Sequence, residues 1–260
     1  MSLDLVQAAL DVLSGMLVGF SLGLVGGGGS ILAVPLMVYL VGVKDPHVAI
    51  GTSALAVAAN AALGLSNHAR HKHVRWQVGL SYAAAGIAGA FAGSTAGKAF
   101  NGQHLLFLFA LLMILVGALM LRPRRHGGNY EAVVTRSNLP KILGLGLVTG
   151  LFSGFFGIGG GFLIVPGLIA ATRMTMINAV GTSLIAVTAF GLTTALNYAW
   201  SGLVDWPLAA LFVLGGILGS AAGTRAAKHL HSAGHLQKIF AGLIFAVAAY
   251  MLWESSSALG

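Results

Sequence analysis

Long apolar stretches separated by short polar connections follow one another along almost the whole chain. Several reach about 18 residues or more, the length at which an α-helix crosses the hydrocarbon core of a bilayer. The second and seventh stretches, at about 12–14 residues, are shorter than the roughly 20 that a comfortable crossing needs. The predicted helical segments are 3–25, 30–43, 47–66, 77–97, 104–121, 140–156, 161–172, 177–198, 207–223 and 236–253.

Composition supports a membrane location for these helices. The chain is 57% hydrophobic and only 8% charged, whereas soluble domains are about 25% charged. It contains no cysteine, so disulfides, thiolate catalysis and cysteine metal sites are excluded. The first residues carry no Lys or Arg, which favours a retained first helix over a cleaved signal peptide. The sequence therefore predicts an all-α integral membrane protein.

Lysine and arginine collect on alternate connections, namely those after the third, fifth, seventh and ninth segments. Because cytoplasmic loops are enriched in these residues, the four connections are predicted to be cytoplasmic and both chain termini periplasmic. The net charge of +8 is then explained by topology and contacts with lipid headgroups. We expect a lipid bilayer as partner and no nucleic acid.

The second half of the chain repeats the first at an offset of 130 or 131 residues. Gly-Thr-Ser strings, tryptophans and glycines coincide at this offset, and the Gly15-Gly19-Gly23 spacing, typical of close helix crossing, returns at Gly146-Gly150-Gly154. Each half holds five segments, an odd number, so the halves must have opposite orientations, as in secondary transporters. The predicted units are a membrane repeat at 1–121, a cytoplasmic linker at 122–139 and an inverted repeat at 140–260.

Glycine-rich strings, Gly26–Gly29 and Gly157–Gly161, interrupt both repeats before their short segments. Each glycine costs a helix about 1 kcal/mol relative to alanine. Irregular backbone at membrane depth is tolerated only where it is buried in protein or lines a wet cavity. We therefore predict helix breaks that face the protein interior near the midplane. The alternative is that the strings serve only close packing or a hinge.

A short helix begins after each string, at Ser30 and at Phe162, and its first N–H groups lack intrahelical partners. Such helix ends bind anions, and glycine lets a ligand approach them closely. Nearby Gly-Thr-Ser strings add hydroxyls that either donate to an anion or bond back to a carbonyl one turn earlier. Asn67 and Asn197 sit at helix ends, where capping or packing is expected. The predicted substrate-binding residues are Gly26, Gly27, Gly28, Gly29, Ser30, Thr52, Ser53, Gly157, Gly159, Gly160, Gly161, Thr182 and Ser183.

Ionisable residues are missing from the centres of all predicted spans. Asp11, near the outer end of the first segment, is the deepest acid, so no clear proton or sodium relay is indicated. His68, His71 and His73 lie among basic residues and are assigned to a cytoplasmic loop. Neither a catalytic motif nor a cofactor or metal site is indicated, and the protein is not expected to be an enzyme. Export of an anion needs no relay, because the negative cell interior drives it.

The strings "GLVGGGGSILAVPLM" with "AIGTSA", and "FFGIGGGFLIVPGL" with "AVGTSL", resemble the sulfite exporter TauE/SafE family of bacterial inner-membrane permeases. The resemblance covers essentially the whole chain. It implies a multi-pass inner-membrane transporter for sulfite, organosulfonates or similar sulfur-containing anions. We expect export by alternating access; the alternatives are a channel-like anion pore, an importer of another organic anion, or a membrane scaffold.

The sequence leaves several properties open. It does not fix the substrate, the coupling ion or the direction of transport. A homodimer is compatible with it, but the oligomeric state is not determined. The first two and the sixth and seventh segments either cross the bilayer fully or re-enter.

Overall fold

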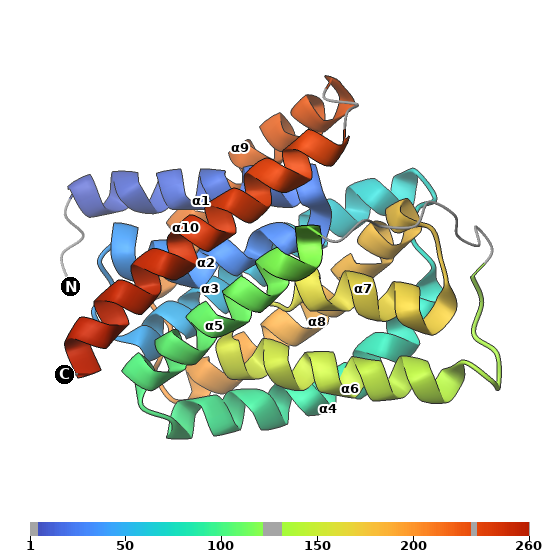
Figure 1. The fold of residues 1–260 in the computed structure, drawn as a ribbon, viewed down its shortest axis with the longest axis horizontal. Helices are drawn as coiled ribbons and strands as arrows, with labels where there is room; N and C mark the ends of the chain where they lie inside the picture. Colours follow the sequence, from blue (N-terminus) through green and yellow to red (C-terminus); the bar gives the residue numbers. More distant parts are fainter. Residues whose placement is uncertain (1–4, 122–131, 230–232, 260) are drawn as a thin grey trace.

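The computed structural model describes residues 5–121, 132–229 and 233–259, which fold into helices joined by short connections without a β-strand (Figure 1). The residues of the predicted linker from 122 to 131 lie outside the described part. The elements are α1 (Leu5–Val25), the 3-10 helix η1 (Gly26–Leu32), α2 (Ala33–Pro35), the π-helix η2 (Leu36–Leu40), α3 (Pro46–Arg70), α4 (Trp76–Ala99), α5 (Gly102–Leu121), α6 (Leu139–Phe156), α7 (Gly161–Thr172), α8 (Met176–Trp200), α9 (Trp206–His229) and α10 (Ala233–Leu259).

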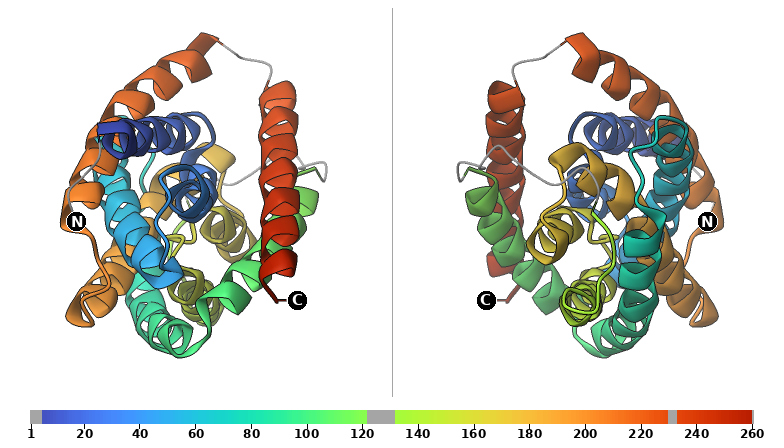
Figure 2. Two further views of the ribbon diagram at one scale, coloured as in Figure 1. Left: turned by 90° about the vertical axis from the view of Figure 1, so that its left-hand side faces the viewer. Right: turned by 90° about the vertical axis from the view of Figure 1, so that its right-hand side faces the viewer.

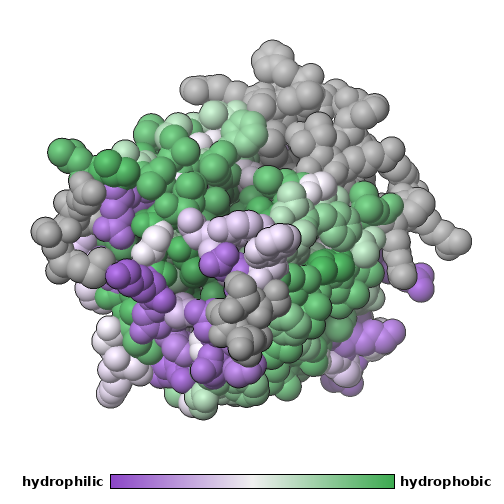
Figure 3. Space-filling view, turned by 60° about the vertical axis from the view of Figure 1, so that its left-hand side comes forward, coloured by the Kyte–Doolittle hydropathy of each residue, from purple (hydrophilic) through white to green (hydrophobic). Residues whose placement is uncertain are grey.

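The helices correspond to the predicted segments, and the all-α membrane fold is confirmed. The second segment is a continuous run of η1, α2 and η2, and the seventh is α7. Within the described residues, six helices are long and apolar enough to cross a bilayer, namely α1, α3, α5, α6, α8 and α9. Large apolar side chains such as Phe91, Leu115 and Leu196 are exposed, and Figure 3 shows broad apolar surface beside a group of hydrophilic residues. This surface suits contact with lipid.

Two helix pairs pack along their whole length, α1 on α9 and α4 on α6. Both contacts depend on glycines that leave no room for a side chain. An added Cβ on Gly19 would overlap the carbonyl of Gly216, and one on Gly150 would overlap the carbonyl of Gly86. These four residues correspond at the repeat offset, so the two pairs are built alike. The predicted use of the glycine spacing for helix crossing is confirmed.

The centre of the bundle holds α3, α8 and the two short segments. α3 packs against α8, and η1 packs against α7. α5 and α10 cross at one side of the bundle (Figure 2). The most buried helices, α3 and α8, carry the two Gly-Thr-Ser strings, whose hydroxyl residues are fully buried. The fold therefore brings the second glycine-rich string, Gly29 and Ser30 of the first, and both Gly-Thr-Ser strings to the protein interior.

Candidate functional site

The second glycine-rich string forms a true helix break. α6 ends at Phe156, and Gly157, Gly159 and Gly160 then have φ values of 69°, 64° and 66°. This left-handed region is rarely adopted by residues that carry a Cβ. Because Gly157–Gly161 is buried, its irregular backbone faces protein rather than lipid, as the physics of the bilayer requires.

The same break rests on α3 of the first repeat. An added Cβ on Gly157 would overlap Cγ2 of Ile50, and one on Gly159 would lie 2.8 Å from Cγ1 of Val57. Substitution at these glycines therefore meets both backbone strain and a packed neighbour. The break is held by contacts between the two halves of the chain.

The first glycine-rich string has a different geometry. Gly26–Gly29 lies inside the 3-10 helix η1, which follows α1 directly, and does not form an open break. An added Cβ on Gly29 would overlap the backbone N of Leu22, so the chain turns tightly back on α1. Ile158 stands where the first string has Gly27, and its side chain is fully buried. The buried Ile158 side chain anchors the second string in the core. The first string has a glycine at this position and therefore lacks such an anchor.

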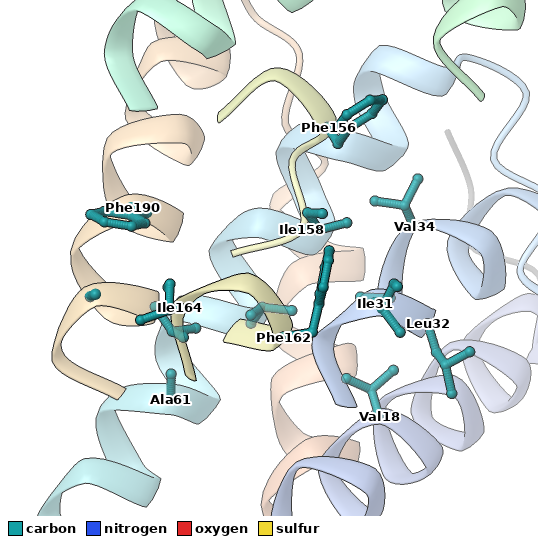
Figure 4. Packing of buried hydrophobic residues seen from close by; sticks show 14 of the residues in the cluster. Val18, Ile31, Leu32, Val34, Ala61, Phe156, Ile158, Phe162, Ile164 and Phe190 are labelled. Carbon is teal, nitrogen blue, oxygen red and sulfur yellow. The ribbon is translucent and has the colours of Figure 1, made fainter. Parts of the chain in front are cut away.

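The two strings meet inside the bundle. Phe162, in the first turn of α7, points toward Ile158, with Ile31 of η1 beside it (Figure 4). These side chains belong to one buried apolar cluster. Ser30 is also fully buried. Apolar side chains thus separate the two strings.

The four predicted hydroxyls of the Gly-Thr-Ser strings all have partners within the protein. Thr52 Oγ1 accepts a hydrogen bond from the backbone N–H of Asp205, and Thr182 Oγ1 accepts one from Arg75, both at 2.9 Å. Ser53 donates to the carbonyl of Ile50 at 3.1 Å, and Ser183 donates to the carbonyl of Val180 at 2.8 Å. The threonine hydroxyls thus tie together connections from the two halves. Each of the two threonine hydroxyls still has its own proton, which it can donate to a further acceptor.

A cavity of about 230 Å³ lies beside the first string, between α1, α3, α8 and α9. Asn67 and His68, assigned from sequence to capping and to a loop, are part of its wall. By contrast Asn197, the repeat counterpart of Asn67, accepts a hydrogen bond from Lys98 Nζ at 2.8 Å and donates to Ser94 at 2.7 Å. The cavity is lined by Leu22, Gly23, Asn60, Ala61, Leu63, Gly64, Asn67, His68, Leu184, Ile217, Ser220 and Ala221.

Asn60 is the most unusual polar residue in this wall. Its side chain is 5% exposed, and neither Oδ1 nor Nδ2 has a hydrogen-bond partner among the described residues. The amide lies over Gly216, as the ring of Phe190 lies over Gly86 in the corresponding place. Sequence reasoning missed Asn60 because it stands in an apolar run; the available signal was its replacement by Phe190 at the repeat offset. A buried amide without a partner is a ready donor and acceptor for a ligand.

Interior helix breaks within a bundle of apolar helices are typical of membrane transporters. The chain matches the family described as Sulfite exporter TauE/SafE over residues 12–251. It belongs to this family and is a membrane transporter, not an enzyme.

Relatives from several bacteria share the description of a membrane transporter. The chain is 52% identical over 250 residues to a "Probable membrane transporter protein" of Xylella fastidiosa (strain 9a5c), with 95% of each chain covered. It is 27% identical over 219 residues to the "Probable membrane transporter protein YdhB" of Bacillus subtilis, covering 83% of this chain and 89% of the relative. A "Probable membrane transporter protein" of Haemophilus influenzae is 27% identical over 206 residues, with 74% of each chain covered. No solved structure matches the chain.

Proposed function

We propose that this transporter carries a small sulfur-containing anion, such as sulfite or an organosulfonate, and exports it across the bacterial inner membrane by alternating access. The family description supports the substrate class. The observation that carries the mechanism is the buried left-handed break before α7. It presents backbone N–H groups at the positive end of a helix, with glycines that let an anion come close.

The proposed anion site is built from backbone and hydroxyl groups of both halves. Its members are the glycines of the two strings together with Ser30, Thr52, Ser53, Thr182 and Ser183. η1 packs against α7, so a modest separation of these elements would open the space before the α7 N-terminus. The conformation described here is then the closed one, with Phe162 and Ile31 occupying the path.

The cavity beside the first string supplies the approach to this site. It reaches from Asn67 and His68, near the predicted cytoplasmic connection, to Gly23, just before the string. An anion that enters from the cell interior would meet the Asn60 amide on the way, and its NH₂ group can donate to oxyanion oxygens. The cavity would thus give an anion access to the site from the cytoplasmic side, which export requires.

An inverted repeat accounts for the way the two halves are joined. The pairs α1–α9 and α6–α4 are counterparts at the repeat offset, and both join a helix of one half to a helix of the other. With units at 1–121 and 140–260 and both termini periplasmic, the α3–α4 connection lies in the cytoplasm and the α8–α9 connection in the periplasm. Rocking of one set of elements against the other is the usual route to alternating access.

Flux measurements test this function against a pore. Purified protein in proteoliposomes loaded with sulfite, sulfate, taurine, sulfoacetate or chloride should exchange sulfite or a sulfonate with saturable kinetics. Saturation and counterflow are properties of a carrier. Flux that rises without saturation would instead identify a channel, and exchange confined to other organic anions would overturn the substrate assignment.

A further inference from the structure

Asp11, in the first half of α1, is a buried acid without a visible partner. Its side chain is 0% exposed, and neither carboxylate oxygen has a hydrogen-bond partner among the described residues. An ionised carboxylate buried in this way loses its hydration without compensation. Within a membrane-spanning segment such residues are rare and mark ion or proton pathways.

Among the described residues, no positive charge offsets that of an ionised Asp11. The charged group that acts on it is Asp205, which precedes α9 and has the same sign. The polar neighbours on the same face of α1 already serve backbone carbonyls. Gln7 donates to the carbonyl of Val41 at 3.3 Å, and Ser14 donates to the carbonyl of Leu10 at 2.8 Å. A bound proton is the simplest way to hold Asp11 in this place.

Packing alone does not require an acid here. At the repeat offset of 131, Asp11 corresponds to Ile142, which is also 0% exposed. α6 packs against α4 with the same glycine contacts that α1 makes with α9. The helix pair therefore forms with an apolar side chain at this position. Because an acid is present in only one repeat, its role is not explained by helix packing.

A short series of interactions runs from Asp205, the charged group that acts on Asp11, to the proposed anion site. The carboxylate of Asp205 accepts a hydrogen bond from Leu208 N at 3.1 Å, and the Asp205 N–H donates to Thr52 Oγ1 at 2.9 Å. Thr52 lies half a turn along α3 from Ile50, which packs on Gly157 of the second break. A shift of α3 relative to α9 would therefore alter both the environment of Asp11 and the support of the break.

We infer that Asp11 is a proton-binding site coupled to transport, so that the protein exchanges an inward-moving proton for an outward-moving anion. The inference rests on the proposed function. In the closed conformation the carboxyl holds a proton taken up from the periplasm. When the transporter opens to the cytoplasm and water enters between α1 and α9, the carboxylate becomes stable and the proton is released to the cytoplasm. Movement of a proton inward and an anion outward shifts charge in the same favourable direction across the membrane.

Proteoliposomes separate coupling from transport itself. Sulfite counterflow is measured at equal pH on both sides, and net sulfite efflux is measured with an acidic exterior and a clamped potential. We expect the pH gradient to accelerate efflux by the wild-type protein at least about fivefold, a typical coupling between two sites. Asp11→Asn should keep counterflow but lose this acceleration, and Ser14→Ala, a buried polar change one turn away, should keep both.

Several results would overturn the inference. One is that the pH gradient accelerates sulfite efflux by Asp11→Asn as much as by the wild type. Another is that the wild type shows counterflow but its efflux does not respond to the pH gradient. The third is that a sodium gradient, and not a proton gradient, accelerates efflux. Absence of sulfite counterflow by the wild-type protein would instead overturn the proposed function. Infrared difference spectra of the purified protein then still test proton binding, because a protonated carboxyl band should be present in the wild type and absent from Asp11→Asn and Asp11→Ile. Spectra without that difference would contradict the site.

Discussion

The hydroxyl of Thr182 accepts a hydrogen bond from the backbone N–H of Arg75 at 2.9 Å. The counterpart contact, from the N–H of Asp205 to Thr52, has the same length. Each threonine belongs to one half of the chain and holds the start of a long helix in the other, α4 or α9. An inverted repeat would produce such reciprocal contacts. The Gly-Thr-Ser strings therefore have a structural role in addition to any contact with substrate.

Removal of either threonine hydroxyl should destabilise the protein. Thr52→Val or Thr182→Val would leave a partly buried N–H without its acceptor, at a cost of about 1 kcal/mol. Thermal unfolding in detergent measures the loss, and Thr→Ser at each position, which keeps the hydroxyl, is the control. Unchanged stability of both valine variants would show that the connections are held in another way.

Gly157→Ala should destabilise the second break for two separable reasons. The left-handed backbone costs about 1–2 kcal/mol for a residue with a Cβ, and the new methyl group overlaps Ile50. Ile50→Ala in the same chain should relieve the overlap but not the strain, so the double variant should be less destabilised than the sum of the single changes. Strict additivity in thermal unfolding would contradict the contact with α3.

Asn60→Phe should block transport without unfolding the protein. The ring copies Phe190 in the corresponding place and would fill the cavity while removing an amide that lacks partners. We expect sulfite exchange to fall at least about tenfold, while thermal stability stays within about 1 kcal/mol. Asn60→Ala separates the two effects, since it removes the amide but leaves the space open, and should mainly raise the half-saturating sulfite concentration. Normal exchange by Asn60→Phe would exclude the cavity as the path.

Single cysteines can test the predicted orientation, because the chain has none of its own. His71, after α3, and Gln103, at the start of α5, are both exposed. A membrane-impermeant thiol reagent added to intact cells should label Gln103→Cys but label His71→Cys only after the membrane is opened. The reverse pattern would place both termini in the cytoplasm.

Local patterns predicted the helices well, because span length and glycine position depend on short stretches of chain. Gly157–Gly161 breaks the helix as expected, since its glycines permit left-handed backbone. Gly26–Gly29 instead winds into a 3-10 helix, because it lacks a side chain such as Ile158 to anchor an open shape. The similar sequence of the strings concealed this difference.

Contacts between distant segments were the part that the sequence did not reveal. Asp11 reads as a residue near a helix end, and the helices packed around α1 bury it. The partners of Thr52 and Thr182 likewise come from connections more than a hundred positions away. Asn60 becomes a candidate binding residue only because four helices form a cavity beside it. The buried environment of a polar residue depends on tertiary structure, which hydrophobic periodicity does not encode.

Sulfite counterflow in proteoliposomes, compared between Gly159→Val and Gly144→Val, tests the central claim most directly. Gly159 combines a φ of 64° with close neighbours in the break, whereas an added Cβ on Gly144 in α6 meets nothing within 4 Å. The account predicts saturable sulfite exchange by the wild type and Gly144→Val, and its loss in folded Gly159→Val. Equal exchange by all three proteins would contradict a backbone anion site at the second break.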